Sequence, residues 1–255
     1  MAIRTDDKWD IWTVNLNTGA ATQVTSDGMA RRPSWSPDGK SIVYDSGIAT
    51  VPGSAPGASI VKRAAADGSG QLDEFGPGRD AVMSHDGQHV FYTREFKIVS
   101  RPVNGGPETS FLPGPPSNNG SPRPSPDGRF LAFMTMTPTS VRVSVTTNPP
   151  GPTRLEISAR ESWWPRWSGG GRQLVFMTAK DVQAVDVHTE PTLRLGIPRR
   201  LFERSVMLGG NAPAPLDVSA DGGRFLVVEQ DKSLSPPRSM VVVTNFTPDR
   251  GSEKR

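Results

Sequence analysis

The sequence contains no cysteine, only three histidines and no long apolar segment. Without cysteine there is no disulfide, thiolate metal ligand or cysteine nucleophile. No run of about 18 apolar residues occurs, and the first residues, "MAIRTDDKWDIW", lack the apolar region of a signal peptide. We therefore expect no direct membrane insertion of this segment, and the chain itself leaves its cellular location open.

Charge of one sign is not concentrated anywhere in the chain. The 29 basic and 26 acidic residues give a formal charge of +3 and a pI near 9.4. No basic block longer than Arg199-Arg200 occurs before the C-terminal tail. This pattern predicts no nucleic-acid partner, and the slight basic excess is a weak indication of an anionic one.

Proline and glycine are abundant instead, with 25 and 26 residues spread over the chain. Their frequency excludes long helices. The segments between them, such as "SIVYD", "HVFYT" and "MVVVTNF", are apolar and β-branched, which is typical of strands. The sequence therefore predicts an all-β protein.

A serine followed by a turn recurs five times, at intervals of 41 to 51 residues. A period in the forties with short strands predicts the four-stranded antiparallel blades of a β-propeller. In the "S-x-D-G" turn, aspartate can accept hydrogen bonds from backbone amides and glycine accepts a positive φ. The anchoring serines are Ser36, Ser84, Ser125, Ser168 and Ser219, and the predicted structural turn residues are Asp38, Gly39, Asp86, Gly87, Asp127, Gly128, Asp221 and Gly222.

Apolar columns follow each turn. The first column is Ile42, Val90, Leu131, Leu174 and Leu226, and the second, two residues later, is Tyr44, Tyr92, Phe133, Phe176 and Val228. The residues between them are apolar as well, which predicts a sheet buried on both faces. The residue before each anchoring serine is expected to pack within an inner strand: Trp35, Met83, Pro124, Trp167 and Val218.

We interpret residues 1–255 as a single propeller domain. The expected units are a half blade at 1–28, successive blades at 29–78, 79–117, 118–160, 161–208 and 209–247, and a disordered tail at 248–255. The predicted strands are fewer than a six-bladed ring of four-stranded blades requires. We therefore expect about five blades and a half, from a longer protein whose full ring has six.

Several of these repeats resemble those of a known family. "PSWSPDGKSIVY", "RPSPDGRFLAF" and "DIWTVNLNTGAATQVT" resemble the repeats of bacterial TolB-type, WD-repeat-like β-propellers. The stretch from "PRWSGGGRQLVFMTAK" through "DVSADGGRFLVVEQ" to "VVVTNF" is similar to the last blades of propellers attached to bacterial serine/threonine kinases or DNA-binding regulators. That resemblance implies a sensor or docking module of a larger signalling protein, periplasmic or extracytoplasmic if the chain belongs to a membrane-anchored protein.

No catalytic motif occurs: the chain has no G-x-S-x-G elbow and no phosphate-binding loop. In "SHDGQH", His85 and His89 flank Asp86 at a spacing that could bind a metal on a helix, but the repeat places them in a hairpin. We therefore predict a protein that is not an enzyme, with no catalytic residue, no metal site and no cofactor. Two alternatives stay open: the propeller of a prolyl-oligopeptidase-type peptidase or lyase-like enzyme, and an envelope assembly or translocation scaffold of TolB type.

The candidate binding residues stand in two alternate columns of the inner strands. If inner strands line the central channel, these side chains approach its mouth and form an anion-binding rim with an aromatic wall. Equally, the arginines could pair with the aspartates and simply neutralise charge. The expected partner is a protein, a peptide or a small ligand at the channel mouth, and the candidate residues are Arg32, Asp80, Arg123, Trp164, Arg166 and Asp217.

Overall fold

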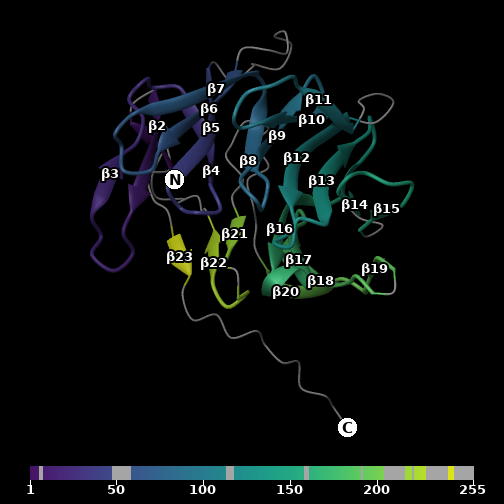
Figure 1. Ribbon diagram of the computed structural model, residues 1–255. Helices are drawn as coiled ribbons and strands as arrows, with labels where there is room; N and C mark the ends of the chain where they lie inside the picture. The colour runs from purple at the N-terminus through teal and green to yellow at the C-terminus, as the bar shows by residue number, and fades with distance from the viewer. Residues whose placement is uncertain are drawn as a thin grey trace.

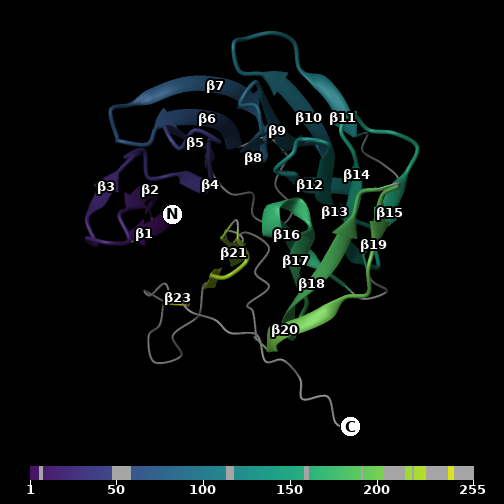
Figure 2. The same cartoon turned by 60° about the horizontal axis from the view of Figure 1, so that its bottom comes forward.

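The computed structural model describes residues 1–5, 8–47, 59–112, 118–157, 161–190, 192–203, 216–219, 221–227 and 241–243. In these ranges the chain is all-β, apart from one turn of 3-10 helix at Gly169–Gly171. Antiparallel sheets follow one another along the chain and stand side by side around a common centre (Figures 1 and 2). This is the β-propeller that the repeat predicts.

Each sheet is one blade, numbered here in chain order. Blade 1 has β1 (Ala2–Thr5), β2 (Lys8–Val14) and β3 (Ala21–Gln23), and blade 2 has β4 (Ala30–Trp35), β5 (Ser41–Gly47), β6 (Ser59–Ala65) and β7 (Gln71–Pro77). Blade 3 has β8 (Arg79–Met83), β9 (His89–Arg94), β10 (Lys97–Pro102) and β11 (Thr109–Leu112), and blade 4 has β12 (Asn118–Pro124), β13 (Phe130–Met136), β14 (Val141–Thr147) and β15 (Arg154–Glu156). Blade 5 has β16 (Trp163–Ser168), β17 (Gln173–Met177), β18 (Asp181–His188), β19 (Arg194–Leu195) and β20 (Arg199–Glu203), and blade 6 has β21 (Leu216–Val218), β22 (Phe225–Val227) and β23 (Val241–Val243).

Strands within a blade pair with their neighbours in sequence, from the inner to the outer strand. In blade 5 the outer strand is interrupted, and β19 and β20 both pair with β18. Blade 1, which the sequence predicts as a half blade at 1–28, contains three described strands, and β1 pairs with β2 from Ala2 opposite Ile11 to Thr5 opposite Lys8.

Apolar clusters fill the interfaces between successive blades. Five clusters join blade 1 to blade 2 and so on to blade 6, and no such cluster among the described residues joins blade 6 to blade 1. In blades 2 to 5 both predicted columns and the residues between them are buried, as the sequence predicted. Burying a sheet on both faces supplies the hydrophobic stabilisation that these short strands need.

In blade 6 the predicted first column was wrong by one residue. The amide of Arg224, not that of Phe225, donates to Ser219 Oγ at 3.0 Å. Phe225, which pairs with Val218, therefore takes the place expected for Leu226, and Leu226 is only partly buried. The double glycine of "SADGGRF" is part of a turn of ordinary length, not an insertion. Val228 lies outside the described residues.

The same corner joins the first two strands of blades 2, 3, 4 and 6. The serine hydroxyl donates to the turn aspartate at 2.5 to 2.6 Å and accepts the amide five residues later at 2.9 to 3.0 Å. The turn glycine has φ between +68° and +75°, a conformation that favours glycine. All eight predicted turn residues therefore lie in these corners, and turn geometry alone explains them.

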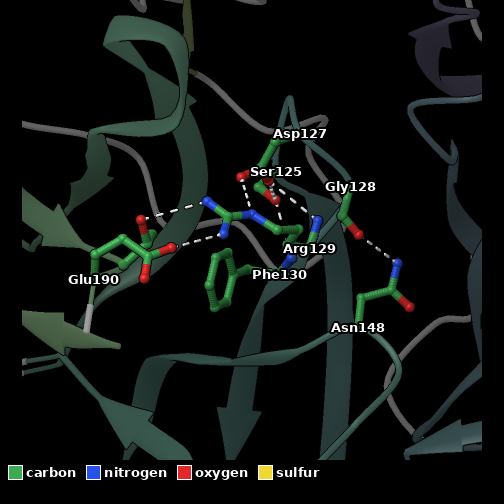
Figure 3. Close-up of polar contacts among 8 residues, drawn as sticks. Ser125, Asp127, Gly128, Arg129, Phe130, Asn148 and Glu190 are labelled. Atoms are coloured by element: carbon green, nitrogen blue, oxygen red, sulfur yellow. Dashed lines mark hydrogen bonds and ion pairs between the residues drawn. The ribbon is translucent and has the colours of Figure 1, made fainter. Parts of the chain in front are cut away.

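The corner of blade 4 also reaches the next blade (Figure 3). Arg129 donates to Asp127 within its own turn at 2.7 Å and to Glu190 of blade 5 at 3.1 Å. On the other side, Asn148 Nδ2 donates to the carbonyl of Gly128 at 2.8 Å. These side chains are largely exposed, so such ion pairs add little to stability.

Residues before the anchoring serines do not all pack as expected. Met83 is buried, and Trp167 packs against the cluster between blades 4 and 5, with its indole N–H donating to the carbonyl of Arg123 at 2.8 Å. Trp35 is 53% exposed, so the prediction that it packs within the core was wrong. The difference lies in the preceding blade, since β12 faces Trp167 and blade 1 has no described inner strand in the equivalent place.

No helix in the described part of the chain has the length and apolar character needed to cross a membrane.

Candidate functional site in the inner strands

The inner strands of blades 2 to 5 share a β-bulge at the same position. The inner strand has one residue more than the second strand over the same length. In blade 2, for example, Arg31 pairs with Asp45 and Ser34 pairs with Val43. The extra residue adopts a left-handed conformation with φ near +50° although it is never glycine: Arg32 (50°), Asp80 (54°), Ser121 (51°) and Trp164 (51°). Bulges and left-handed non-glycine residues cost energy and are frequent beside functional sites.

Proline accompanies this bulge in three of the four blades. Pro33, Pro122 and Pro165 directly follow the left-handed residue. Proline has no N–H to leave unpaired and occurs within sheets mainly at edges and bulges. It is the sequence signal that could have located the bulges.

The amide of each left-handed residue in blades 3 to 5 bonds to a side chain of the preceding blade. The Asp80 amide donates to Asp45 Oδ1 at 3.2 Å, and the Ser121 amide donates to Thr93 Oγ1 at 3.2 Å. The Trp164 amide approaches the sulfur of Met134 at 3.4 Å. The bulge therefore joins neighbouring blades, which gives it a structural role independent of any ligand.

Arg32 is held in a buried ion pair. Its guanidinium donates to both oxygens of Asp45 at 2.8 and 2.6 Å and lies 3.5 Å from Asp80. The side chains of Arg32 and Asp45 are only 12% and 2% exposed. Burial alone would lower the pKa of Arg32, but Asp80, Asp45 and the hydrogen bonds to Asp45 outweigh it and raise the pKa. The charge of Arg32 is thus already paired within the protein, and its role is structural.

Arg123 and Arg166 stand in the same column of adjacent blades and have a different environment. Each donates to the carbonyl of its preceding proline, at 2.6 Å for Arg123 and 2.9 Å for Arg166. Arg166 also lies 3.2 Å from Asp217, a mostly exposed carboxylate in blade 6. Among the described residues, no carboxylate lies within 4 Å of Arg123.

The surroundings of Arg123 disfavour its charge. Burial, together with the nearby charge of Arg166, lowers the pKa of Arg123 to about 9, although Asp80 and Asp217 oppose the shift. A guanidinium stays protonated at neutral pH. The lowered pKa therefore represents a cost of keeping this cation in place, and an anion beside Arg123 would offset that cost.

The structure brings the predicted site residues together as two groups. Arg32 lies with Asp80, and Arg166 lies with Asp217 and is close enough to Arg123 to interact electrostatically. Trp164 packs against the cluster between blades 5 and 6, beside Trp163 at a ring distance of 6.4 Å. Its aromatic surface therefore contributes to blade packing.

Sequence reasoning missed Asp45. Its position in the second strand corresponds to Thr93 and Met134, so it is a single acid at the end of the otherwise apolar "SIVYD". That isolated carboxylate was the available signal, because a charge in a buried strand needs a partner.

A shallow hollow of about 440 Å³ lies at the opposite end of the inner strands, at the corner between blades 5 and 6. Blade 5 has three glycines in place of the usual turn, and the buried Ser168 Oγ has no hydrogen-bond partner in the described structure. The lining includes charged side chains of both signs, Arg172, Asp186 and Asp221, together with His188. The hollow therefore has no charge of a single sign that would indicate an anionic or a cationic ligand.

The histidines of "SHDGQH" occupy a hairpin. His85 lies in the turn and His89 begins β9, and both are exposed. The part of the chain that the structure describes contains no group of three or more His, Cys, Asp or Glu side chains that could hold a metal ion.

Comparisons with solved structures identify the class of fold. TolB from Agrobacterium tumefaciens has a TM-score of 0.60 at 19% identity, covering 79% of this chain and 76% of that one. TolB from Acinetobacter baumannii has a TM-score of 0.56 at 18% identity, covering 78% and 50%. The β-propeller domain of Cps50 (Swd1) from Myceliophteria thermophila has a TM-score of 0.61 at 11% identity, covering 94% and 88%.

The chain is an all-β propeller whose four-stranded blades match those of TolB and other β-propeller structures. No protein-family profile matches the sequence, and no curated protein sequence matches it either. Identities below 25% establish the fold only, because propellers carry many unrelated functions.

Proposed function

We propose that this protein is a non-catalytic binding module. Its ligand is a protein, a peptide or a small molecule, and a carboxylate group of that ligand binds beside Arg123 and Arg166. One observation carries the proposal. Arg123 is a half-buried guanidinium near a second cation, without a carboxylate within ion-pair distance in the described structure.

The chemistry of the pair suits a carboxylate. A guanidinium presents a planar set of donors that can bind both oxygens of a carboxylate. In each arginine one guanidinium nitrogen donates to a prolyl carbonyl. This bond fixes the orientation of the guanidinium and leaves other N–H groups for a ligand. A ligand carboxylate would also reduce the repulsion between the two cations.

Arg32 serves as the contrast within the same molecule. Its charge is already matched by Asp45 and Asp80, so a ligand would have to compete with a bidentate pair. We therefore assign ligand binding to blades 4 and 5, and blade joining to the Arg32 group.

The test compares acetyl-alanyl-alanine with its C-terminal amide, because the two probes differ only in the carboxylate. Binding is measured by NMR titration at constant ionic strength on the wild type, Arg123→Met and Arg142→Met. Arg142 is a matched control because it forms an exposed pair with Glu156 at 3.4 Å on outer strands. We expect the acid to bind the wild type and Arg142→Met at least tenfold more tightly than it binds Arg123→Met. We expect the amide to bind none of these three proteins. Equal binding of acid and amide, or equal binding by Arg123→Met, would overturn it.

We further propose that the module is the sensing or docking part of a larger bacterial signalling protein. The support is the resemblance of the stretch from "PRWSGGG" to "VVVTNF", residues 165–246, to propellers attached to kinases and DNA-binding regulators. The coding sequence upstream tests this role. A kinase or DNA-binding domain with a membrane span is the expected result, whereas a hydrolase domain would favour the peptidase alternative and a secretion signal directly before the propeller would favour an envelope scaffold.

A further inference from the structure

One edge of the Arg123 guanidinium has no protein acceptor. Its Nη1 donates to the Pro122 carbonyl at 2.6 Å, and in the part of the chain that the structure describes neither Nε nor Nη2 donates to any group. Arg32 shows what such an edge can bind, because its Nε and Nη2 donate to the two oxygens of Asp45 at 2.8 and 2.6 Å. The open edge of Arg123 therefore has the geometry to bind both oxygens of one carboxylate.

The corresponding edge of Arg166 is already in use. Its Nη1 donates to the Pro165 carbonyl, and its Nε donates to Asp217 Oδ1 at 3.2 Å. The same oxygen of Asp217 accepts the amide of Val218 at 3.0 Å, which fixes the carboxylate. A ligand carboxylate bound to Arg123 therefore has a protein carboxylate as a neighbour, on the far side of Arg166.

The charges around Arg123 are balanced within the protein. The charges that change its pKa are those of one cation, Arg166, and two anions, Asp80 and Asp217. Asp80 also lies 3.5 Å from Arg32, and Asp217 is 63% exposed. A ligand carboxylate gains direct hydrogen bonds at Arg123, but a second negative charge on the same ligand meets no further cation in this group and is repelled by both acids.

We propose that the site selects ligands with a single negative charge and that Asp217 is the residue that disfavours a dianion such as a dicarboxylate. This inference rests on the proposed carboxylate site and adds its selectivity. Asp80 is less suited to a test, since it lies in the Arg32 ion-pair group and its amide joins blade 3 to Asp45. Water screens the exposed charge of Asp217, so we expect a preference of roughly threefold to fivefold.

The test compares acetyl-alanyl-glutamine with acetyl-alanyl-glutamate, which have nearly the same shape and carry one and two negative charges at pH 7. NMR titration at constant ionic strength measures the affinity of the wild type, Asp217→Asn and Glu156→Gln for both probes. Asparagine keeps an oxygen for the Val218 amide. Glu156 is the matched control, because it forms an exposed pair with Arg142 at 3.4 Å on outer strands and its replacement changes the net charge equally.

We expect the wild type and Glu156→Gln to prefer the glutamine probe, and Asp217→Asn to lose most of that preference through tighter binding of the glutamate probe. Equal affinity of the wild type for the two probes, or an unchanged preference in Asp217→Asn, would overturn this inference and leave the carboxylate site standing. An equal loss of preference in Glu156→Gln would also overturn it, because net charge would then set the selectivity. Absence of binding by both probes would overturn the proposed function, and this inference with it.

Discussion

Replacement of Arg32 by methionine tests the ion pair that joins the inner strand of blade 2 to its second strand. The substitution removes the cation and leaves the carboxylate of Asp45, a residue 1% exposed, with the amide of Asp80 as its remaining described partner at 3.2 Å. Methionine keeps much of the apolar volume of the arginine side chain. The main effect is therefore electrostatic.

The expected loss in the free energy of unfolding is about 3–5 kcal/mol, the cost of leaving a buried charge without its partner. For a chain of this size, each kcal/mol lowers the melting temperature by about 2–4 °C, so we expect a decrease of roughly 6–20 °C. The double variant Arg32→Met with Asp45→Asn should recover most of this loss. Asparagine carries no charge and can still accept the Asp80 amide.

The loss should also depend on pH. Burial raises the pKa of Asp45, although Arg32 opposes this shift, so removing Arg32 raises the pKa further. A carboxyl group with a raised pKa in the folded state is penalised above that pKa and relieved as protonation neutralises it. The difference between the wild type and Arg32→Met should therefore narrow as pH falls from 7 towards 5.

Urea denaturation followed by circular dichroism measures these quantities for the wild type, Arg32→Met, the double variant and the exposed control Arg142→Met. The control should stay within about 0.5 kcal/mol of the wild type, as exposed ion pairs do. A loss below about 1 kcal/mol in Arg32→Met, or a double variant no more stable than the single one, would refute the assigned role of a buried charge pair.

Three further predictions concern the repeated structural features. Asp86→Asn should lower the melting temperature at pH 7, and the difference from the wild type should shrink as the pH falls below about 4. Ser84 and the Gln88 amide lower the pKa of Asp86, so its contribution is present above the ordinary pKa near 4 and is lost as the pH falls through the lowered pKa. Melts between pH 2 and pH 7 check this, and a deficit independent of pH would contradict it. Thr93→Val should cost about 1–3 kcal/mol in urea denaturation because the Ser121 amide loses its acceptor, and an unchanged midpoint would count against the blade-joining role of the bulge. Gly78→Ala should cost about 1–3 kcal/mol because a Cβ there would lie 2.5 Å from the Tyr92 ring, and a neutral result in the same assay would show that the ring can move.

Periodicity made most of the fold predictable. Short apolar runs follow each turn at a regular interval and are bounded by proline and glycine, which predicts buried strands, so residues such as Leu131 and Phe133 could be placed without a structure. The turn serine and aspartate are likewise local, because their hydrogen bonds close within five residues of sequence. The misplacement of Leu226 arose where two glycines concealed an ordinary turn length.

Features that depend on a neighbouring blade could not be predicted in the same way. Trp35 is exposed because blade 1 has no described inner strand beside it. Its own repeat could not predict this, since that repeat matches the one containing Trp167, which does bond to an inner strand. The bulges were not predicted either. We assumed that side chains alternate strictly along "RRPSW", and this assumption leaves no place for an extra residue, although Pro33 marks where it occurs. For the site, the shared column of Arg123 and Arg166 was visible in the repeat, but which arginine finds a carboxylate depends on contacts between blades.

Thermal denaturation of Arg123→Met and the wild type, with and without acetyl-alanyl-alanine, tests the central claim most directly. If Arg123 is a cation held ready for a carboxylate, removing it should raise the melting temperature of the free protein by about 2–4 °C, as for a gain of roughly 1 kcal/mol. The same substitution should abolish the stabilisation by the acid, so that the two melting temperatures converge or cross as the probe is added. A free Arg123→Met protein that melts below the wild type, yet is stabilised equally by the acid, would contradict the account.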